Sequence, residues 1–284
     1  MKVLVLGVSG MLGNTVLRYF ADDSRYQVFG SARSSAVRRA FPPSLAERIV
    51  LGTDVDNPDS LALLFAKVQP DVVINCIGLV KQLAEANDPL QAIPINSLLP
   101  HRLARLCAIA GARLVHVSTD CVFDGARGGY TEADQSDATD LYGRSKYLGE
   151  VRYEHTITLR TSIIGHELNS ANGLVGWFLG QQGSIKGYTK AIFSGLPTVE
   201  LAHVIRDVVL PHPQLHGLYH VAAQPINKFD LLTLVKQTYQ KEIEIVADDK
   251  LRIDRSLNAD RFREATGYSA PAWPELIQKM ANFK

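Results

Sequence analysis

Short runs of apolar residues alternate with longer amphipathic stretches through residues 1–160 of the chain. The runs are nearly continuous Val, Ile and Leu, which is typical of strands whose two faces are both covered by helices. Strands that alternate with helices in this way build a parallel sheet, so the pattern predicts an α/β fold with a doubly wound parallel sheet. The predicted strands are 2–7, 26–31, 48–51, 71–76, 113–118 and 156–160, and the predicted helices are 11–21, 58–68, 90–110 and 141–154.

The pattern becomes less regular after Gly165, where several glycines interrupt it. We therefore expect a larger first domain over residues 1–160 and a smaller lobe over 161–284, with segments near 199–222 returning to the first domain. The later elements expected are a strand at 217–221 and helices at 199–209, 228–239, 258–265 and 273–281.

Composition and charge narrow the class of protein. The chain has 284 residues, of which 46% are hydrophobic and 21% charged, as in an ordinary globular protein. Its formal net charge of +1 gives no field that would attract nucleic acid or an anionic membrane, and we find no apolar run as long as a membrane span or a signal segment. Cys76, Cys107 and Cys121 form no CxxC pair. We expect a cytoplasmic protein with no metal, no nucleic-acid partner and no membrane contact.

A glycine-rich segment joins the first predicted strand to the first predicted helix. Gly7, Gly10 and Gly13 follow the spacing GxxGxxG. Glycines at such a turn allow a tight bend and let a pyrophosphate approach the unpaired N–H groups at the helix N-terminus. The segment predicts a dinucleotide-binding Rossmann domain over residues 1–160, with the lobe over 161–284 binding the substrate. The plainer interpretation is a glycine cluster that only starts a helix.

The residue expected to select the cofactor stands just after the second predicted strand. Proteins selective for NAD usually present an acid there to the adenosine ribose, but this chain has Arg33. A guanidinium pairs with the 2′-phosphate of NADPH, and Arg38 and Arg39 are near enough in sequence to add to its field. The sequence therefore favours NADPH, with NADH as the alternative if these arginines are ordinary surface residues.

Three further residues form a candidate catalytic set. Tyr142 and Lys146 have the spacing YxxxK, which puts a phenol and an ammonium one turn apart on the same helix face. Thr119 follows the fifth predicted strand, at the sheet edge where doubly wound folds bind ligands. Each alone has a simpler explanation, a surface pair or a strand-end hydroxyl that caps the backbone. Together they predict a catalytic site, in which we expect the Lys146 ammonium to lower the pKa of Tyr142.

These segments together resemble the extended short-chain dehydrogenase/reductase family, in particular its dTDP-4-dehydrorhamnose reductase-like branch. The resemblance spans most of the chain. It rests on 7–13, Asp54 and Val55, 75–78, Asn96, 117–125, the YxxxK and 159–162.

The resemblance implies an NAD(P)-dependent oxidoreductase that reduces the ketone of a nucleotide-linked 4-keto-6-deoxy sugar in the biosynthesis of polysaccharide precursors. It implies that Tyr142 donates the proton, that Lys146 also binds the nicotinamide ribose, and that Thr119 binds the ketone oxygen. The cofactor-binding residues, besides Gly7, Gly10, Gly13 and Arg33, would be Met11 and Leu12 at the pyrophosphate, Asp54 and Val55 at the adenine, and Cys76, Ile77 and Gly78 beneath the dinucleotide.

The substrate side is less sharply defined by the sequence. Lys81 and Gln82 follow the fourth predicted strand, where they would meet a diphosphate or form a solvated loop. Gly78 stands where the family often has Ala, and Cys121 where the branch usually has Tyr, which predicts a different substrate pocket. The candidate substrate residues are Lys81, Asp120, Cys121 and Val122.

Three alternatives remain open. Dehydratases of the family carry an Asp-Glu pair directly after the catalytic Thr, but here Asp120 and Cys121 follow it, which argues against dehydration. Epimerases usually retain NAD, against which Arg33 argues. The third alternative is an NADP-binding regulatory subunit that resembles the methionine adenosyltransferase β subunit. The resemblance also implies a homodimer.

Overall fold

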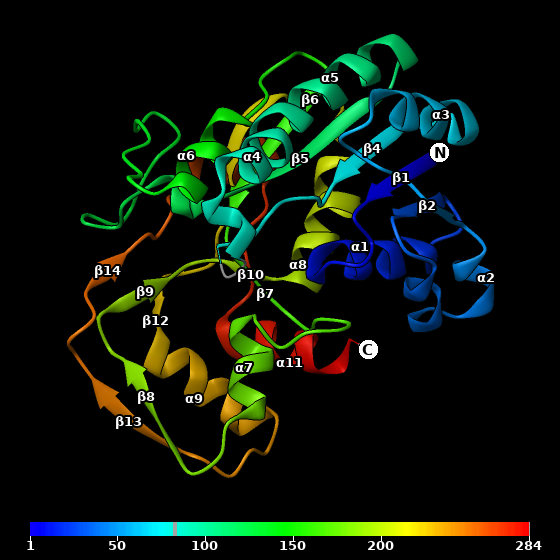
Figure 1. The fold of residues 1–284 in the computed structure, drawn as a ribbon. Coiled ribbons are helices and arrows are strands. Elements are labelled where there is room, and N and C mark those ends of the chain that lie inside the picture. Colours follow the sequence, from blue (N-terminus) through cyan, green and yellow to red (C-terminus); the bar gives the residue numbers. More distant parts are fainter. Residues whose placement is uncertain (82–83, 284) are drawn as a thin grey trace.

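A computed structural model describes residues 1–81 and 84–283 of the chain. Within these residues the centre is a seven-stranded parallel sheet in the order β11-β6-β5-β4-β1-β2-β3 (Figure 1). The order runs outward in both directions from β1 and β4, as in a doubly wound nucleotide-binding sheet, so the predicted fold class is confirmed. Its strands are β1 (Lys2–Leu6), β2 (Gln27–Ala32), β3 (Ile49–Leu51), β4 (Val72–Asn75), β5 (Arg113–Thr119), β6 (Thr156–Thr161) and β11 (Gly217–His220).

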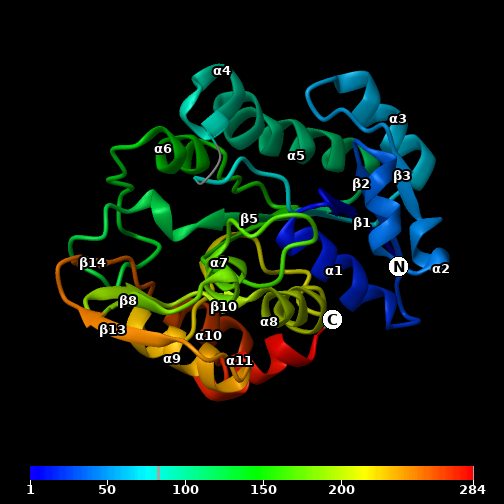
Figure 2. The same cartoon turned by 60° about the horizontal axis from the view of Figure 1, so that its bottom comes forward.

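Helices cover both faces of this sheet (Figure 2). One face carries α3 (Pro58–Val68), α4 (Pro89–Ala92), α5 (Leu99–Ala110) and α6 (Leu141–Leu148), and the other carries α1 (Met11–Ala21), α8 (Thr198–His203) and α11 (Trp273–Asn282). Side chains alternate along β1: Val3 and Val5 belong to the core under α1, and Leu4 and Leu6 to the core under α3 and α5. A strand buried on both faces must be apolar at every position, which explains the continuous apolar runs.

The predicted helix 90–110 is interrupted. α4 is followed by a π-helical segment, Ile93–Leu98, before α5 begins. Pro94 within this segment has no N–H to donate, and a proline ring disturbs a regular helix. The wider turn directs the Asn96 amide to the backbone of Leu79, from whose N–H it accepts (2.9 Å) and to whose carbonyl it donates (3.2 Å). The chain after β4 is thereby held against the helix layer.

α6 ends at Leu148, although the pattern predicts a helix to residue 154. A Cβ at the next residue, Gly149, would lie 2.0 Å from the Asn96 carbonyl oxygen, so only glycine fits where α6 crosses the π-helical segment. Glycine is also a poor helix former. A close tertiary contact therefore sets the end of α6, which an amphipathic pattern does not reveal.

A smaller lobe packs beside the sheet (Figure 1). Its short strands pair across long sequence separations, β13 with β8 and β12 and β14 with β9, so the local pattern did not predict them. The domain boundary at residue 160 stays a prediction. The lobe contains β7 (Ile163–Ile164), α7 (Leu174–Gly180), β8 (Ser184–Tyr188), β9 (Ala191–Phe193), β10 (Leu196–Pro197), β12 (Ile226–Asn227), α9 (Lys228–Thr238), β13 (Glu244–Asp248), β14 (Ile253–Asp254) and α10 (Asp260–Thr266).

Shorter helical segments complete the chain: Ser35–Ala40, α2 (Pro43–Ala46), Ala84–Asn87, Asp120–Val122 and Val204–Val209. In the ranges that the structure describes, we find no helix with both the length and the apolar content needed to cross a membrane.

Candidate active site

The turn between β1 and α1 has the geometry of a phosphate site. Gly7 has a φ of +81°, and a Cβ at Gly13 would lie 2.2 Å from the Gly7 carbonyl oxygen. Gly10 caps α1 without a side chain, so no side-chain oxygen accepts from the first N–H groups of the helix. These N–H groups and the helix dipole favour an anion. The residues present therefore fit the pyrophosphate of a dinucleotide.

The chain after β4 lies directly against this turn. A Cβ at Gly7 would lie 2.8 Å from Ile77 Cγ1 and 3.4 Å from the Cys76 carbonyl carbon. β1 and β4 are the neighbours at which the strand order changes direction, where sheets of this kind bind ligands. The structure thus brings together two segments that the sequence assigned to the same dinucleotide.

The first two residues of α1 differ in what their side chains contact. Met11 is half-buried, and its Sδ would lie 3.3 Å from a Cβ at Gly165, so the chain after β7 covers it. Leu12 is 6% exposed and belongs to the core beneath the sheet. Its side chain therefore serves the core, and only its backbone can face a pyrophosphate.

The arginines expected near the adenosine separate into two kinds. Arg33 is exposed immediately after β2. Arg38 is already engaged, because its Nη2 donates a hydrogen bond to the Ile49 carbonyl oxygen (2.9 Å). Arg33 is the better candidate for a 2′-phosphate.

Asp54 and Val55 lie in the loop after β3. The Asp54 backbone N–H donates to Ser60 Oγ (3.0 Å), and its carboxylate accepts from the Asp56 N–H (3.1 Å). Val55 is 9% exposed and packs into the core under α3. Both residues have structural roles here, and their contact with an adenine stays a prediction.

The three candidate catalytic residues converge. Thr119 ends β5 and is among the residues that shift the pKa of the Tyr142 phenol. Lys146 lies one turn further along α6, and its Nζ would be 3.7 Å from a Cβ at Gly78. A Cβ at Gly143 would lie 2.2 Å from the Cys121 carbonyl oxygen, so α6 rests directly on the turn after Thr119. Contacts therefore run from the glycine turn through Gly78 to the YxxxK helix.

The phenol of Tyr142 is kept in its neutral form. Burial raises the pKa of Tyr142 above its ordinary value, and Cys121 raises it further, while Thr119 lowers it. The Nζ of Lys146 donates to the Val117 carbonyl oxygen (2.9 Å). The expectation that Lys146 lowers the pKa of Tyr142 stays a prediction, because in this structure the ammonium is directed at the backbone of β5.

Lys146 itself is strongly perturbed. The residue is 5% exposed, and burial lowers the pKa of Lys146 to about 8, against an opposing effect of Glu150. At neutral pH most molecules still carry the ammonium. The charge of this residue is thus sensitive to its buried neighbours.

The four candidate substrate residues differ in accessibility. Lys81 is exposed and pairs with Asp140 (2.6 Å), while Gln82 lies outside the described residues. Asp120 accepts from the Thr119 hydroxyl (3.2 Å), and burial raises the pKa of its carboxyl group. Cys121 is half-buried beside them.

Val122 differs from the other three candidates in its burial, and its contact with a substrate stays a prediction. Its side chain has no exposed surface and packs with Phe123, Tyr130 and Leu257 in a separate small core. A strand-end motif cannot reveal which of its residues turn inward, and here the side chain of Val122, at the end of the turn Asp120–Val122, lies in that core.

Two cations that sequence reasoning missed reach this corner from the small lobe. Lys228 begins α9, and its Nζ lies 4.4 Å from the centre of the Phe193 ring. Arg255 follows β14, and its Nε donates to the Phe123 carbonyl oxygen (2.7 Å). Both lower the pKa of Asp120. No local signal marks them, because only the folded lobe brings them to Asp120.

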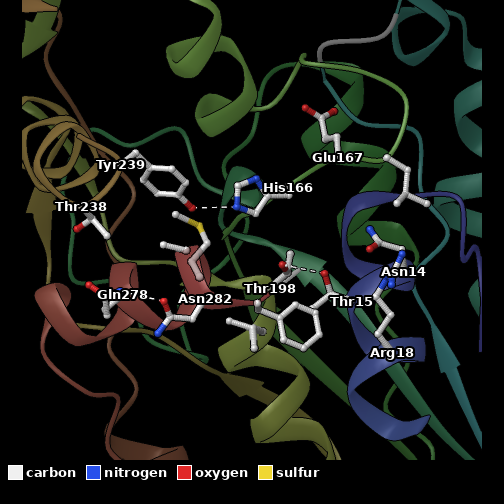
Figure 3. A pocket seen from close by; sticks show the side chains of 15 residues that line it. Asn14, Thr15, Arg18, His166, Glu167, Thr198, Thr238, Tyr239, Gln278 and Asn282 are labelled. Carbon is white, nitrogen blue, oxygen red and sulfur yellow. Dashed lines mark hydrogen bonds between the residues drawn. The ribbon is translucent and has the colours of Figure 1, made fainter. Parts of the chain in front are cut away.

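A pocket of about 480 Å³ lies elsewhere, between α1, α8, the end of α11 and the chain after β7 (Figure 3). Polar side chains in its walls form hydrogen bonds with one another. His166 and Tyr239 share one (2.9 Å), as do Thr15 and Thr198 (3.1 Å). None of the candidate catalytic residues lines it.

Fold and site together define a Rossmann-type protein of the short-chain dehydrogenase/reductase class. The family model described as the RmlD substrate binding domain matches residues 1–282, and the chain belongs to this family. The family lies in the extended branch of that class, as predicted.

Similarity to individual proteins is moderate. The chain is 34% identical to dTDP-4-dehydrorhamnose reductase of Mycobacterium tuberculosis over 155 residues, 52% of this chain and 44% of that protein. It is 29% identical to methionine adenosyltransferase 2 subunit beta of Rattus norvegicus over 149 residues, 52% and 41% of the two chains. The chain thus spans less than half the length of these two relatives.

One solved structure shows the same fold over the full length. It is dTDP-4-dehydrorhamnose reductase of Bacillus anthracis in complex with NADP, with a TM-score of 0.80, 21% identity and coverage of 99% of this chain and 98% of that one.

Proposed function

We propose that the protein is an NADPH-dependent reductase that acts on the ketone of a nucleotide-linked 4-keto-6-deoxy sugar, in the supply of polysaccharide precursors. The observation that carries the proposal is that α6, with Tyr142 and Lys146, rests on the turn after Thr119 and brings Lys146 beside Gly78 and the glycine turn. The name of the Mycobacterium tuberculosis relative supports the substrate class.

NADPH, when bound, supplies a hydride to the ketone carbon, which leaves negative charge on the ketone oxygen. Thr119 would donate a hydrogen bond to that oxygen, and Tyr142 would give it a proton. The raised pKa of Tyr142 keeps this proton available near neutrality. Lys146 would leave the Val117 carbonyl to meet the ribose hydroxyls, from where its charge would favour the phenolate.

The binding residues follow the same assignment. We propose that Gly7, Gly10, Met11, Leu12, Gly13, Arg33, Asp54, Val55, Cys76, Ile77 and Gly78 surround the cofactor, with Leu12 using its backbone. Lys81, Asp120, Cys121 and Val122 remain the substrate candidates. Lys228 and Arg255 join them, since two cations beside the reacting corner suit the diphosphate of a sugar nucleotide.

The direct test is oxidation of NADPH by the purified protein with dTDP-, UDP- and GDP-linked 4-keto-6-deoxy sugars, followed by absorbance. We expect turnover with one nucleotide class and identification of the alcohol by mass spectrometry. Failure of all three substrates to oxidise NADPH would contradict the proposal.

Replacement of Arg33 by Ala is expected to weaken NADPH binding by about 10- to 100-fold, the loss of one charge-assisted contact to the 2′-phosphate. NADH binding should not change, because NADH lacks that phosphate. Fluorescence titration of both nucleotides measures the effect, with Arg25→Ala as a control at an exposed arginine paired with Asp23. Equal losses for NADPH and NADH would remove Arg33 from the selection of the cofactor.

A regulatory role is the second candidate, and the similarity to methionine adenosyltransferase 2 subunit beta favours it. It requires a stable complex with a catalytic methionine adenosyltransferase subunit, which size-exclusion chromatography with light scattering detects. The same measurement on the protein alone tests the predicted homodimer. An epimerase would instead release NAD when denatured, which mass spectrometry detects.

A further inference from the structure

A buried ion pair lies immediately behind the YxxxK helix. Arg160 on β6 donates from Nε and Nη2 to the two carboxylate oxygens of Glu150, at 2.8 and 2.7 Å. Their side chains are 1% and 2% exposed. Removing two charges from water costs several kcal/mol per ion before their attraction is counted, so stability alone is a weak reason for such a pair.

The pair is attached to the catalytic residues on both sides. Glu150 lies four residues after Lys146, at the same end of α6. Ser118, the neighbour of Thr119, donates its hydroxyl to Glu150 Oε1 (2.8 Å), and Lys146 donates to the carbonyl oxygen of Val117 (2.9 Å). The carboxylate and the ammonium are thus bound to consecutive residues of β5.

Several charged and titratable groups surround Lys146, and Glu150 is the acid among them that affects its charge. Burial lowers the pKa of Lys146, and Glu150 and Cys76 raise it. Burial raises the pKa of the Cys76 thiol to about 12, so it is uncharged at neutral pH. Burial also lowers the pKa of His116 on β5 well below its ordinary value, so this ring is neutral. Among the described residues, Glu150 is therefore the acid that opposes loss of the lysine proton.

On the other side of the pair, Arg160 contacts neutral groups. Arg160 Nη1 donates to His220 Nε2 on β11 (3.0 Å), and the Phe123 ring lies 5.0 Å from the guanidinium carbon. Burial lowers the pKa of His220 to about 3, so the ring accepts this bond as a neutral imidazole. Arg152 approaches Glu150 only from the exposed side, at 4.0 Å.

We propose that Glu150, fixed by Arg160 and Ser118, is a positioning residue that holds the Lys146 side chain as a cation and fixes the direction from which it reaches the cofactor. The part of the inference that concerns the cofactor rests on the proposed function. The part that concerns the charge of Lys146 does not.

The test compares two variants of Glu150 in the free protein. Glu150→Gln removes the charge, and Glu150→Asp keeps it on a shorter side chain. The titration midpoint of Lys146 is measured by NMR of protein labelled at the lysine ε-carbon, with the signal assigned through Lys146→Arg. We expect Glu150→Gln to lower the midpoint by about one pH unit or more, a tenfold loss of proton affinity, and Glu150→Asp to leave it close to wild type.

A purely structural role predicts a different pattern, in which both variants lose stability and neither moves the midpoint; that result would overturn the inference. Glu150→Gln leaves Arg160 unpaired and can fail to fold, so the double variant Glu150→Gln, Arg160→Met removes both charges together. It should lower the midpoint in the same direction, because Arg160 is not among the groups that shift the pKa of Lys146. An unchanged midpoint in the folded double variant would also overturn the inference.

NADPH affinity against pH gives the second readout. In the wild type we expect binding to weaken as pH rises through about 8, where Lys146 loses its proton. In Glu150→Gln the weakening should begin about one unit lower, with little change in affinity at the acidic end. If the NMR midpoint moves but NADPH does not bind either protein, the proposed function fails while the charge relation between Glu150 and Lys146 stands. If NADPH binds and the pH dependence is the same in both, the positioning role is wrong.

Discussion

Replacement of Tyr142 by Phe is expected to lower kcat for keto-sugar reduction by about a thousandfold, the usual scale for loss of a general acid. Tyr142 is half-buried on α6, which rests on the turn after Thr119, and burial raises the pKa of its phenol, which keeps it protonated. Phe preserves the ring and its packing on α6. The rate of NADPH oxidation under saturating substrate measures the effect.

The matched control is Tyr153→Phe. That phenol shares a hydrogen bond with His101 (3.3 Å) away from the glycine turn, so its loss should leave kcat unchanged. Tyr142→Phe should also leave NADPH affinity unchanged, since Lys146 and the glycine turn remain. Full turnover by Tyr142→Phe would remove this residue from the mechanism, and loss of NADPH binding would show that the hydroxyl, not the ring that Phe retains, is needed to bind the cofactor.

The raised pKa of Tyr142 also indicates which change ligand binding must make in the site. A neutral phenol with a raised pKa is ready to donate but is a weak acid, so the transition state requires an added positive charge nearby. In this structure the Lys146 ammonium donates a hydrogen bond to the Val117 carbonyl oxygen. We therefore expect the full catalytic geometry only when the ribose hydroxyls compete for that ammonium.

Local patterns in the sequence were enough to predict the central sheet and the helices that lie alone against it. α1 and α3 begin and end where their patterns predict, because a proline or a glycine turn starts each one and one face is buried. The interruption at Ile93–Leu98 and the early end of α6 at Leu148 were missed. The interruption contains Pro94, and the end of α6 depends on a tertiary contact, in which Gly149 meets the backbone of Asn96.

The residues of the site also divide into those that local sequence patterns reveal and those that only the fold reveals. A strand end and an i,i+4 pair are local features, so Thr119, Tyr142 and Lys146 could be named from the sequence and the topology of a parallel sheet. The groups that tune them were not visible. Lys228 acts on Asp120 from another lobe, and Arg160, the partner of Glu150, lies on β6. In the sequence, a charged residue that will be buried cannot be distinguished from one at the surface, because its ion-pair partner is not known.

Replacement of Arg160 by Met is expected to lower the free energy of unfolding by about 3–5 kcal/mol, the cost of leaving one partner of a buried ion pair uncompensated. Glu150 would keep its hydrogen bond from Ser118 but lose two charge-assisted bonds from the guanidinium. Met has a similar length and leaves no large cavity. Urea unfolding, followed by circular dichroism, should show a lower midpoint with an unchanged slope.

Arg25→Met is the control for removal of an arginine from an ion pair, because Arg25 and its partner Asp23 lie at the surface and its side chain is 62% exposed. Surface pairs contribute little, so its unfolding curve should follow the wild type. The double variant Glu150→Gln, Arg160→Met should recover most of the stability that Arg160→Met loses, since no buried charge is left alone. If the double variant is instead as unstable as the sum of the two single variants, Glu150 and Arg160 act independently, and the coupling that holds the carboxylate behind Lys146 is absent.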